Sequence, residues 1–299
     1  MQVLTDGEVL RKLRKLRGLS QKECCHGIVS RHTYSRIERN QTNLQFQIFT
    51  ELLERLNTSY ADFLFLKKEK ERLNIYRQKL SSLNKKNIQE NDPLELYAYF
   101  EKNKNKSIQN FHYYLLCKKK MEKLDFDQIE KINMTDLNQL TMYINNLTFF
   151  SILDLNLISD MSDYLTYDTI KKGSLKAIKK LTYNNLTLAY QQAVHQFFYS
   201  ITSVALKNED YTFTKYLLKQ TNNFLSFFPD HYFLLFSHVN RHTLNYKLSQ
   251  NNYYLSKLFI LKDCMKELKD EQSVKQIENQ IKLLLQHSSS HPTPTTILH

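Results

Sequence analysis

The scarcity of helix-breaking residues is the feature that most limits how this chain can fold. Its 299 residues include only four glycines and four prolines, and Pro292 and Pro294 lie among the last eight residues. Glycine and proline are the residues that most often end helices and form turns. Apolar residues recur at helical spacing along most of the chain, without the alternation typical of strands. We therefore expect an all-α protein.

The same composition argues against an enzyme. A chain with four glycines can hardly build the turns that cradle phosphates, and it contains neither an H-E-x-x-H motif nor a nucleophile elbow. His238 and His242 stand one helical turn apart, but no acidic or cysteine ligand lies nearby in sequence. The cysteines, Cys24, Cys25, Cys117 and Cys264, lack metal-knuckle spacing. We expect no catalytic residue, no metal site and no cofactor.

Targeting signals are also missing from the sequence. The N-terminus has no apolar core of the kind that a signal peptide needs, and no apolar run approaches the roughly 18 residues of a membrane span. We expect a cytoplasmic protein with reduced cysteines.

Charge points to a polyanionic partner. The formal net charge is +12, and residues 1–60 contain ten lysines and arginines against six acidic residues. An excess of this kind is the electrostatic footprint of nucleic-acid binding.

Three capping boxes mark helix starts in the first sixty residues. They are Thr5-x-x-Glu8, Ser20-x-x-Glu23 and Ser59-x-x-Asp62, in which a hydroxyl and a carboxylate satisfy backbone amides reciprocally. The apolar stripes between them predict a small four-helix bundle followed by a further helix. The stripes are Val9, Leu10, Leu13 and Leu16; Cys24, Cys25 and Ile28; Tyr34 and Ile37; and Leu44, Ile48, Leu52, Leu53 and Leu56.

The second and third of these helices have helix-turn-helix spacing. Ser30 is a good N-cap for a helix that runs through Arg39. Cys25 stands where two crossing helices need a small residue. Asn40 follows the third helix, at a position that favours a left-handed conformation. The stretch LSQKECCHGIVSRHTYSRIERN, residues 19–40, therefore predicts this motif.

This stretch resembles the helix-turn-helix of the xenobiotic-response-element class of repressors. With its short connection and the run Ser35-Arg36-Ile37-Glu38-Arg39, it is similar to regulators of the Rgg/GadR/MutR family. The resemblance covers about sixty residues, and Cys25 and Asn40 replace the alanine and glycine that the family often has.

The resemblance implies roles for individual residues. The third helix would enter the major groove, where arginine can pair with guanine and histidine can donate or accept. The implied base readers are Arg31, His32, Thr33 and Arg36, of which Thr33 is the weaker candidate. The implied phosphate contacts are Gln21, Lys22, Arg39 and Asn43. A structural ion pair is implied between Arg14 and Glu38.

Breaks in the helical pattern suggest a domain organisation. We expect a DNA-binding domain at 1–66, a helical linker at 67–92, a regulatory domain of tetratricopeptide-like helix hairpins at 93–286 and a disordered tail at 287–299. Two segments of the regulatory domain match at an offset of 42 residues, for example Leu206 with Leu248 and Lys215 with Lys257. Such hairpins stack into an α-solenoid because one hairpin cannot bury its apolar face alone.

The family resemblance also implies a ligand. Rgg-type proteins carry such a repeat domain, where it binds short secreted peptides that return to the cytoplasm. Aromatic and amide side chains suit an extended peptide. The residues with suitable chemistry are Tyr143, Asn146, Tyr183, Tyr190, Gln191 and His195. The last helical stripe, from Val274 to Gln286, would either cap the solenoid or pair with a second chain, and repressor-type domains usually bind paired half-sites as homodimers.

Three functions remain open at the level of sequence. The preferred one is a transcription regulator that binds double-stranded DNA and is controlled by a short peptide. A second is a helical-repeat scaffold whose N-terminal bundle is a docking module. A third keeps DNA binding but senses a small molecule or a partner protein.

Overall fold

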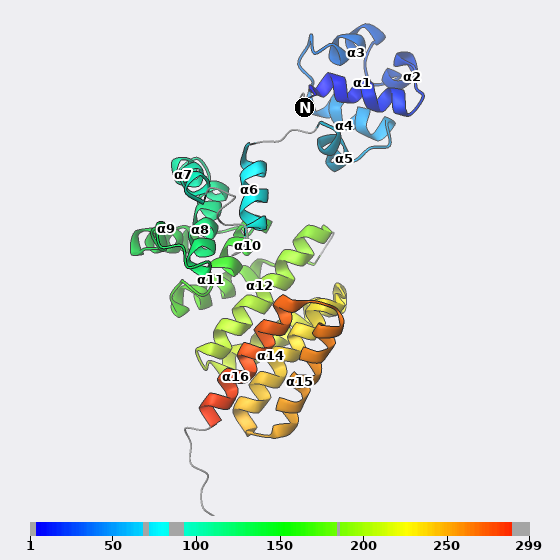
Figure 1. The fold of residues 1–299 in the computed structure, drawn as a ribbon. Coiled ribbons are helices and arrows are strands. Elements are labelled where there is room, and N and C mark those ends of the chain that lie inside the picture. Colours follow the sequence, from blue (N-terminus) through cyan, green and yellow to red (C-terminus); the bar gives the residue numbers. More distant parts are fainter. Residues whose placement is uncertain (1–3, 68–71, 84–92, 184–185, 289–299) are drawn as a thin grey trace, which may run out of the picture. The chain divides into compact units, whose positions relative to one another are not determined.

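The computed structural model describes residues 4–67, 72–83, 93–183 and 186–288, in which all regular structure is helical and no strand occurs (Figure 1). The all-α class is thus confirmed. The described helices form two compact units, Met1–Leu96 and Tyr97–His299. The first contains α1 (Asp6–Leu16), α2 (Gln21–Cys25), α3 (Arg31–Glu38), α4 (Phe46–Arg55), α5 (Tyr60–Lys67), α6 (Arg72–Ser82) and the start of α7 (Pro93–Asn103). The second contains α8 (Ile108–Lys123), α9 (Met134–Asn146), α10 (Ile152–Met161), α11 (Tyr167–Lys180), α12 (Leu188–Lys207), α13 (Tyr211–Phe227), α14 (His231–Ser249), α15 (Asn252–Glu267) and α16 (Glu271–Ser288).

The first five helices enclose one apolar core. Helix α1 contacts α3 and α5, and α2 contacts α3 and α4. Ten of the core's eleven buried members lie on the predicted helical stripes, and the eleventh, Phe63, lies on α5. Of the other stripe residues, Ile28, Leu44 and Ile48 are only partly buried. Leu16 is 67% exposed because it is the last residue of α1, beyond the turn that packs on the bundle. The core consists of Val9, Leu10, Leu13, Cys24, Cys25, Tyr34, Ile37, Leu52, Leu53, Leu56 and Phe63.

Several sequence expectations fall partly outside the described residues. Helix α5 ends at Lys67 and α6 begins at Arg72, so the structure does not test whether one long helix spans both. The break at Lys85 to Asp92, the Asn184-Asn185 pair and residues 289–299 of the tail are not described. The domain boundaries remain predictions, and the two units divide at Leu96, inside α7.

Gly18 follows α1 in the left-handed conformation, but several other helix ends use a different residue there. Asn40, at φ 54°, follows α3, and its amide donates to the Ile37 carbonyl while the Gln41 amide donates to the Arg36 carbonyl, both at 2.9 Å. This is the Schellman pattern, in which the last carbonyls of a helix find donors. The same pattern follows α4, α8, α12 and α15. The left-handed residues there are Asn57, Asp125, Glu209 and Lys269.

The even-numbered helices of the second unit form a continuous layer. Helix α8 contacts α10, α10 contacts α12, α12 contacts α14, and α14 contacts α16. The odd-numbered helices α13 and α15 pack beside this layer, and α14, α15 and α16 lie side by side (Figure 1). Helix α16 buries Ile277, Ile281 and Leu284 against its neighbours, as expected of a helix that caps a stack.

Helices α13 and α15 correspond at an offset of 41 residues rather than 42. The N-cap of α13, Asp210, corresponds to Asn251 before α15, and the buried Leu217 corresponds to the buried Leu258. At an offset of 42, Leu218 would correspond to Ile260, which is 52% exposed. The sequence match was out of register by one residue because similar residues occupy neighbouring positions on both stripes.

Candidate nucleic-acid interface and regulatory site

Helices α2 and α3 form a helix-turn-helix in which both N-caps act as the sequence predicts. The Ser20 amide donates to Glu23 Oε2 at 2.7 Å, and the Glu23 amide donates to Ser20 Oγ at 3.2 Å. Ser30 Oγ accepts from the Thr33 amide at 3.1 Å. Gly27 turns the chain between the helices at φ 78°, a conformation that glycine adopts without steric cost.

A buried contact fixes α2 on α3. Cys24 Sγ lies 3.2 Å from the Tyr34 hydroxyl oxygen, and both side chains are fully buried. Burial raises the pKa of the Cys24 thiol, so the contact joins neutral groups. Cys25 is also buried, at 3% exposure, where the small residue was expected.

Arg14 and Glu38 form the ion pair that the family resemblance implies. Arg14 Nε lies 2.6 Å from Glu38 Oε1, and Nη2 lies 3.1 Å from Oε2. Gln21 Nε2 donates to the same Oε2 at 2.8 Å. Burial alone would raise the pKa of Glu38, but the hydrogen bonds from Arg14 and Gln21 hold it below its usual value. The pair ties α1, α2 and α3 together.

Other basic side chains of the bundle also serve its internal structure. Arg17 donates to the carbonyls of Leu56 and Asn57 at 3.0 and 2.9 Å. Arg55 donates to those of Glu23 and His26 at 2.8 and 3.0 Å. Sequence reasoning missed both roles, since nothing in their local pattern separates these arginines from solvent-facing ones.

The expected base readers lie mainly at the surface of α3. Arg31, His32 and Arg36 are exposed, and His32 and Arg36 lie one turn apart on the same face. Arg36 Nη2 reaches the Gln41 carbonyl at 3.3 Å. Thr33 is half-buried, and its hydroxyl oxygen lies 2.9 Å from Ser30 Oγ, so that group takes part in the helix cap.

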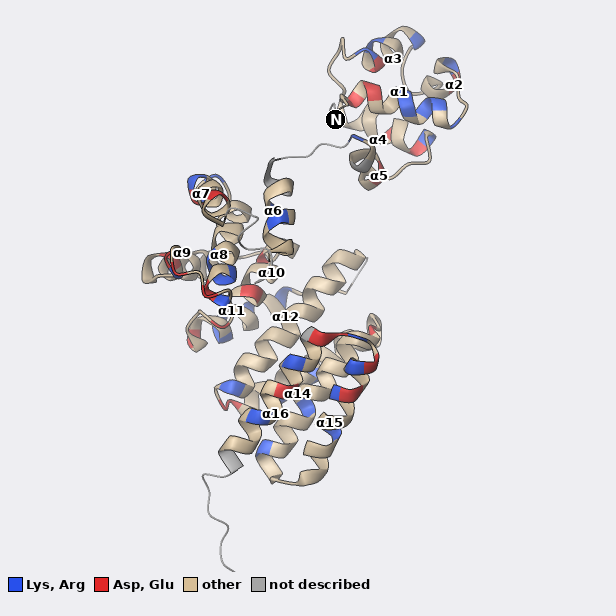
Figure 2. Cartoon of the chain, viewed as in Figure 1, with Lys and Arg blue, Asp and Glu red and all other residues tan. Residues whose placement is uncertain are grey.

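The side chains expected to contact phosphates differ in exposure and in internal hydrogen bonding. Lys22, Arg39 and Asn43 are exposed. Gln21 is half-buried, and its amide nitrogen is engaged by Glu38. Figure 2 marks in blue the lysine and arginine positions of the chain, which occur on α1, α2 and α3 of this unit. The surface of α3, flanked by Lys22 and Arg39, can approach a polyanion without competing carboxylates on α3, because Glu38 is buried.

Three of the six residues suggested for peptide binding make internal hydrogen bonds. Tyr143 of α9 donates to Asp154 Oδ1 at 2.5 Å, and Tyr190 of α12 donates to the Phe150 carbonyl at 3.0 Å. Burial, together with the nearby Asp154 carboxylate, raises the pKa of both tyrosines. Gln191 Nε2 donates to the Leu186 carbonyl at 2.9 Å. The structure thus brings Tyr143 and Tyr190 together at the junction of α9, α10 and α12.

The other three suggested residues lie elsewhere in the second unit. Asn146 is exposed at the end of α9. Tyr183 packs against Phe224, Phe227 and Phe228 of the α13 region, with ring centroids 5.6, 5.2 and 6.5 Å away. His195 is only 3% exposed, so its side chain faces the interior of the unit. A helical stripe does not show which of its polar members face a neighbouring helix.

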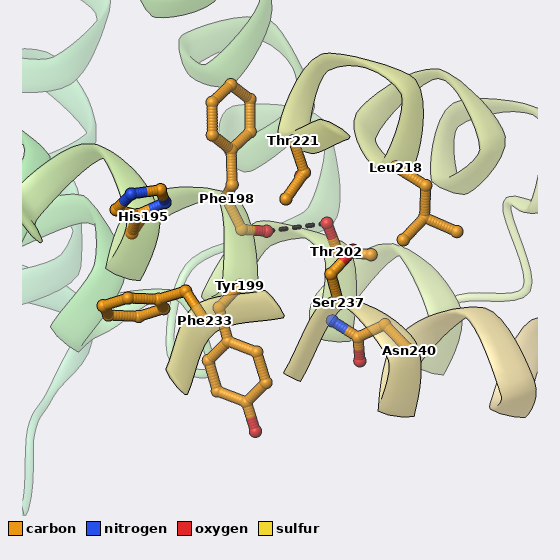
Figure 3. A pocket seen from close by; sticks show the side chains of 9 residues that line it. All are labelled: His195, Phe198, Tyr199, Thr202, Leu218, Thr221, Phe233, Ser237 and Asn240. Atoms are coloured by element: carbon orange, nitrogen blue, oxygen red, sulfur yellow. Dashed lines mark hydrogen bonds between the residues drawn. The ribbon is translucent and has the colours of Figure 1, made fainter. Parts of the chain in front are cut away.

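His195 belongs to a small internal cavity between α12, α13 and α14 (Figure 3). Its ring stacks on Phe233 at 4.9 Å and meets Phe224 edge-on at the same distance. The cavity has a volume of about 10 Å³, room for one water molecule. His195 Nδ1, Ser237 Oγ and Asn240 Oδ1 line it without a hydrogen-bond partner among the described residues. Burial lowers the pKa of His195.

Two further expectations concern metals and membranes. The rings of His238 and His242 stack with centroids 6.1 Å apart. Among the described residues, no group of three histidine, cysteine or acidic side chains could hold a metal ion. Within the same ranges, no helix is both long and apolar enough to cross a bilayer.

Known proteins share this architecture. A family model described as helix-turn-helix matches residues 10–63. The structure of the SHP pheromone receptor Rgg2 from Streptococcus dysgalactiae superimposes with a TM-score of 0.76 at 14% identity, over 93% of this chain and 99% of that one. PrgX gives 0.75 at 15% identity, over 97% and 96%. The PrgX/cCF10 complex gives 0.74 at 16% identity, over 93% and 92%. No curated protein matches the chain. At these identities the likeness establishes a common fold.

Proposed function

We propose that this chain is a DNA-binding transcription regulator of the Rgg type, without enzymatic activity, controlled by a short peptide that binds its second unit. The DNA-binding part of the proposal rests on a difference in contacts among the arginines of the first unit. Arg14, Arg17 and Arg55 donate to groups elsewhere in the bundle. Arg31 and Arg36 are exposed on α3, and Arg36 donates to the Gln41 carbonyl just beyond the end of its own helix. Exposed arginines on the second helix of a helix-turn-helix motif, one at its start and one in its last turn, suit base recognition in the major groove.

The peptide part rests on the shared fold. Rgg2 is described as a pheromone receptor, and PrgX has been crystallised with cCF10. We propose that the surface around Tyr143, Tyr190 and Gln191 receives such a peptide, with Asn146 three residues after Tyr143 on α9 and Tyr183 acting through its packing on α13. His195 would act from the interior, through the packing of α12. The peptide would favour one arrangement of the helices, and its preference would shift the DNA-binding equilibrium.

We further propose a cytoplasmic homodimer. Repressor-type domains bind paired half-sites, and two-fold symmetry of the protein matches that of the operator. Leu283 and Leu285 of α16 are 57% and 45% exposed, which suits a second role for this helix beside capping.

A mobility shift on DNA upstream of the chain's own coding sequence tests DNA binding. Arg31→Ala and Arg36→Ala should each abolish specific binding, whereas Arg11→Ala, an exposed cation on α1, should leave it within a few-fold. Binding should weaken steeply with salt because phosphate contacts release counterions. A chain that binds neither this DNA nor neighbouring promoters, with or without short apolar peptides, would instead favour the scaffold.

A further inference from the structure

A groove between α13 and α14 carries cations and amides but no carboxylate. Its volume is about 410 Å³, within the range of ligand sites in proteins. The cations are Lys215, Lys219 and Arg241, and the amides are Asn222, Asn223 and Asn245. They line it because residues three and four apart share a helix face.

These cations are not neutralised by the protein. Within the described ranges, none of Lys215, Lys219 and Arg241 forms an ion pair. Arg241 Nη2 donates instead to Asn222 Oδ1 at 2.9 Å, which leaves its charge uncompensated. Both lysines are exposed and can move toward a ligand.

Burial and the charge of Arg241 both contribute to lowering the pKa of two neighbouring histidines. Burial lowers the pKa of His238, and the charge of Arg241 lowers it further. For His242 burial comes first, and then the charges of His238, Arg241 and Lys257. A second positive charge disfavours the imidazolium form, which agrees with the uncompensated charge of Arg241.

The floor of the groove is apolar. Leu218 and Leu244 line it and belong to one buried cluster with Leu206. An apolar floor contributes little to the binding of a free inorganic anion or a phosphate backbone. It can, however, pack against aliphatic side chains of a ligand. Asparagine amides beside it match the donors and acceptors of an extended polypeptide.

We propose that this groove binds an extended acidic polypeptide segment, with aspartate or glutamate side chains at Lys215, Lys219 and Arg241 and apolar side chains over Leu218 and Leu244. The groove shares none of the residues assigned above to the signalling peptide, and the inference is independent of the proposed function. It makes the second unit a docking surface for an acidic partner protein.

The test uses the full chain and a fluorescein-labelled peptide of alternating leucine and glutamate, with fluorescence anisotropy as the readout. A second peptide carries glutamine in place of each glutamate. Lys215→Gln combined with Lys219→Gln should weaken binding of the acidic peptide about tenfold, because two exposed charge contacts are lost. Arg241→Gln should weaken it as well.

The matched control combines Lys266→Gln with Lys275→Gln, which removes the same charge from exposed positions of α15 and α16. It should bind like the unmodified chain, as should Arg31→Ala. Circular dichroism establishes that each variant is folded. Equal binding by the groove and control variants, equal binding of the glutamine peptide, or no binding by the unmodified chain in the micromolar range would each overturn the proposal.

Discussion

Gly7 of α1 packs so closely on the end of α3 that a methyl group at its Cα would overlap the Ile37 carbonyl oxygen. The Gly7 amide donates to Asn40 Oδ1 at 3.0 Å, and Asn40 Nδ2 donates to Thr5 Oγ1 at 2.5 Å. Asn40 therefore has two roles: its backbone ends α3, and its side chain holds the start of α1 there. A glycine at this position would provide only the first of these.

Gly7→Ala should destabilise the first unit by about 1–3 kcal/mol, because the overlapping atom belongs to a rigid backbone. Gly18→Ala is the comparison, because a Cβ atom there would meet nothing within 4 Å. Only the positive φ of 68° should lower the unfolding free energy of that variant, by roughly 1 kcal/mol. Urea unfolding followed by circular dichroism measures both. If the two variants lose equal stability, the close approach of α1 to α3 is unimportant.

The pair between Arg14 and Glu38 should make the first unit sensitive to acid. The folded-state pKa of Glu38 lies below its ordinary value. The stabilisation is therefore complete above the unfolded pKa and is lost as pH falls through the folded one. Glu38→Gln should cost about 3 kcal/mol at neutral pH, since it leaves Arg14 without a charged partner.

The variant should also lose part of the acid dependence. We expect its unfolding free energy to change less than that of the unmodified chain between about pH 5 and pH 3. Glu54→Gln, at an exposed position of α4, is the control and should keep the original slope. An unchanged slope in Glu38→Gln would show that other carboxylates govern acid unfolding.

The cysteines should differ sharply in reactivity. Cys264 is exposed, whereas Cys24, Cys25 and Cys117 are buried. Burial raises the pKa of Cys117 to about 12, which suppresses the reactive thiolate. One thiol should therefore react quickly with a maleimide in the folded chain, and Cys264→Ser should remove that reaction. Rapid modification of Cys24 or Cys25 would show that the core of the first unit opens to solvent.

The internal cavity offers a test of its unpaired polar groups. Ser237→Ala removes a buried hydroxyl that has no partner among the described residues, so it should leave stability unchanged or raise it by about 1 kcal/mol. Thr202→Val is the comparison, because the Thr202 hydroxyl donates to the Phe198 carbonyl at 2.6 Å. A loss of stability in Ser237→Ala, measured by thermal unfolding, would indicate that the hydroxyl has a water partner.

Local chemistry was predictable from sequence, whereas contacts between helices were not. Capping by Ser20 and Ser30 depends on residues three positions away, so the sequence displays it directly. The left-handed Asn40 follows from the helix end. The link from Gln21 to Glu38 and the burial of His195 depend on how helices rotate against each other, which one sequence does not encode in any short pattern.

Asp210 links α11 to the start of α13. As N-cap it accepts from the Phe213 amide at 2.9 Å, and it also accepts from Lys171 Nζ at 2.5 Å and from the Tyr167 hydroxyl at 2.7 Å. The hydrogen bond from Lys171 is the main cause that lowers the pKa of Asp210 to about 2. The stabilisation from this carboxylate is therefore present above the ordinary aspartate pKa and is lost as pH falls toward 2.

Asp210→Asn should preserve the helix cap but lose the ion pair, because asparagine is itself a good N-cap. We expect a loss of about 1 kcal/mol at neutral pH, since Lys171 is partly exposed to solvent. Asp210→Ala should cost about 1 kcal/mol more, because it removes the cap as well. Guanidinium chloride would screen the ion pair, so urea unfolding is the measurement. If the asparagine and alanine variants are equally unstable, the cap contributes nothing and Asp210 acts only through Lys171 and Tyr167.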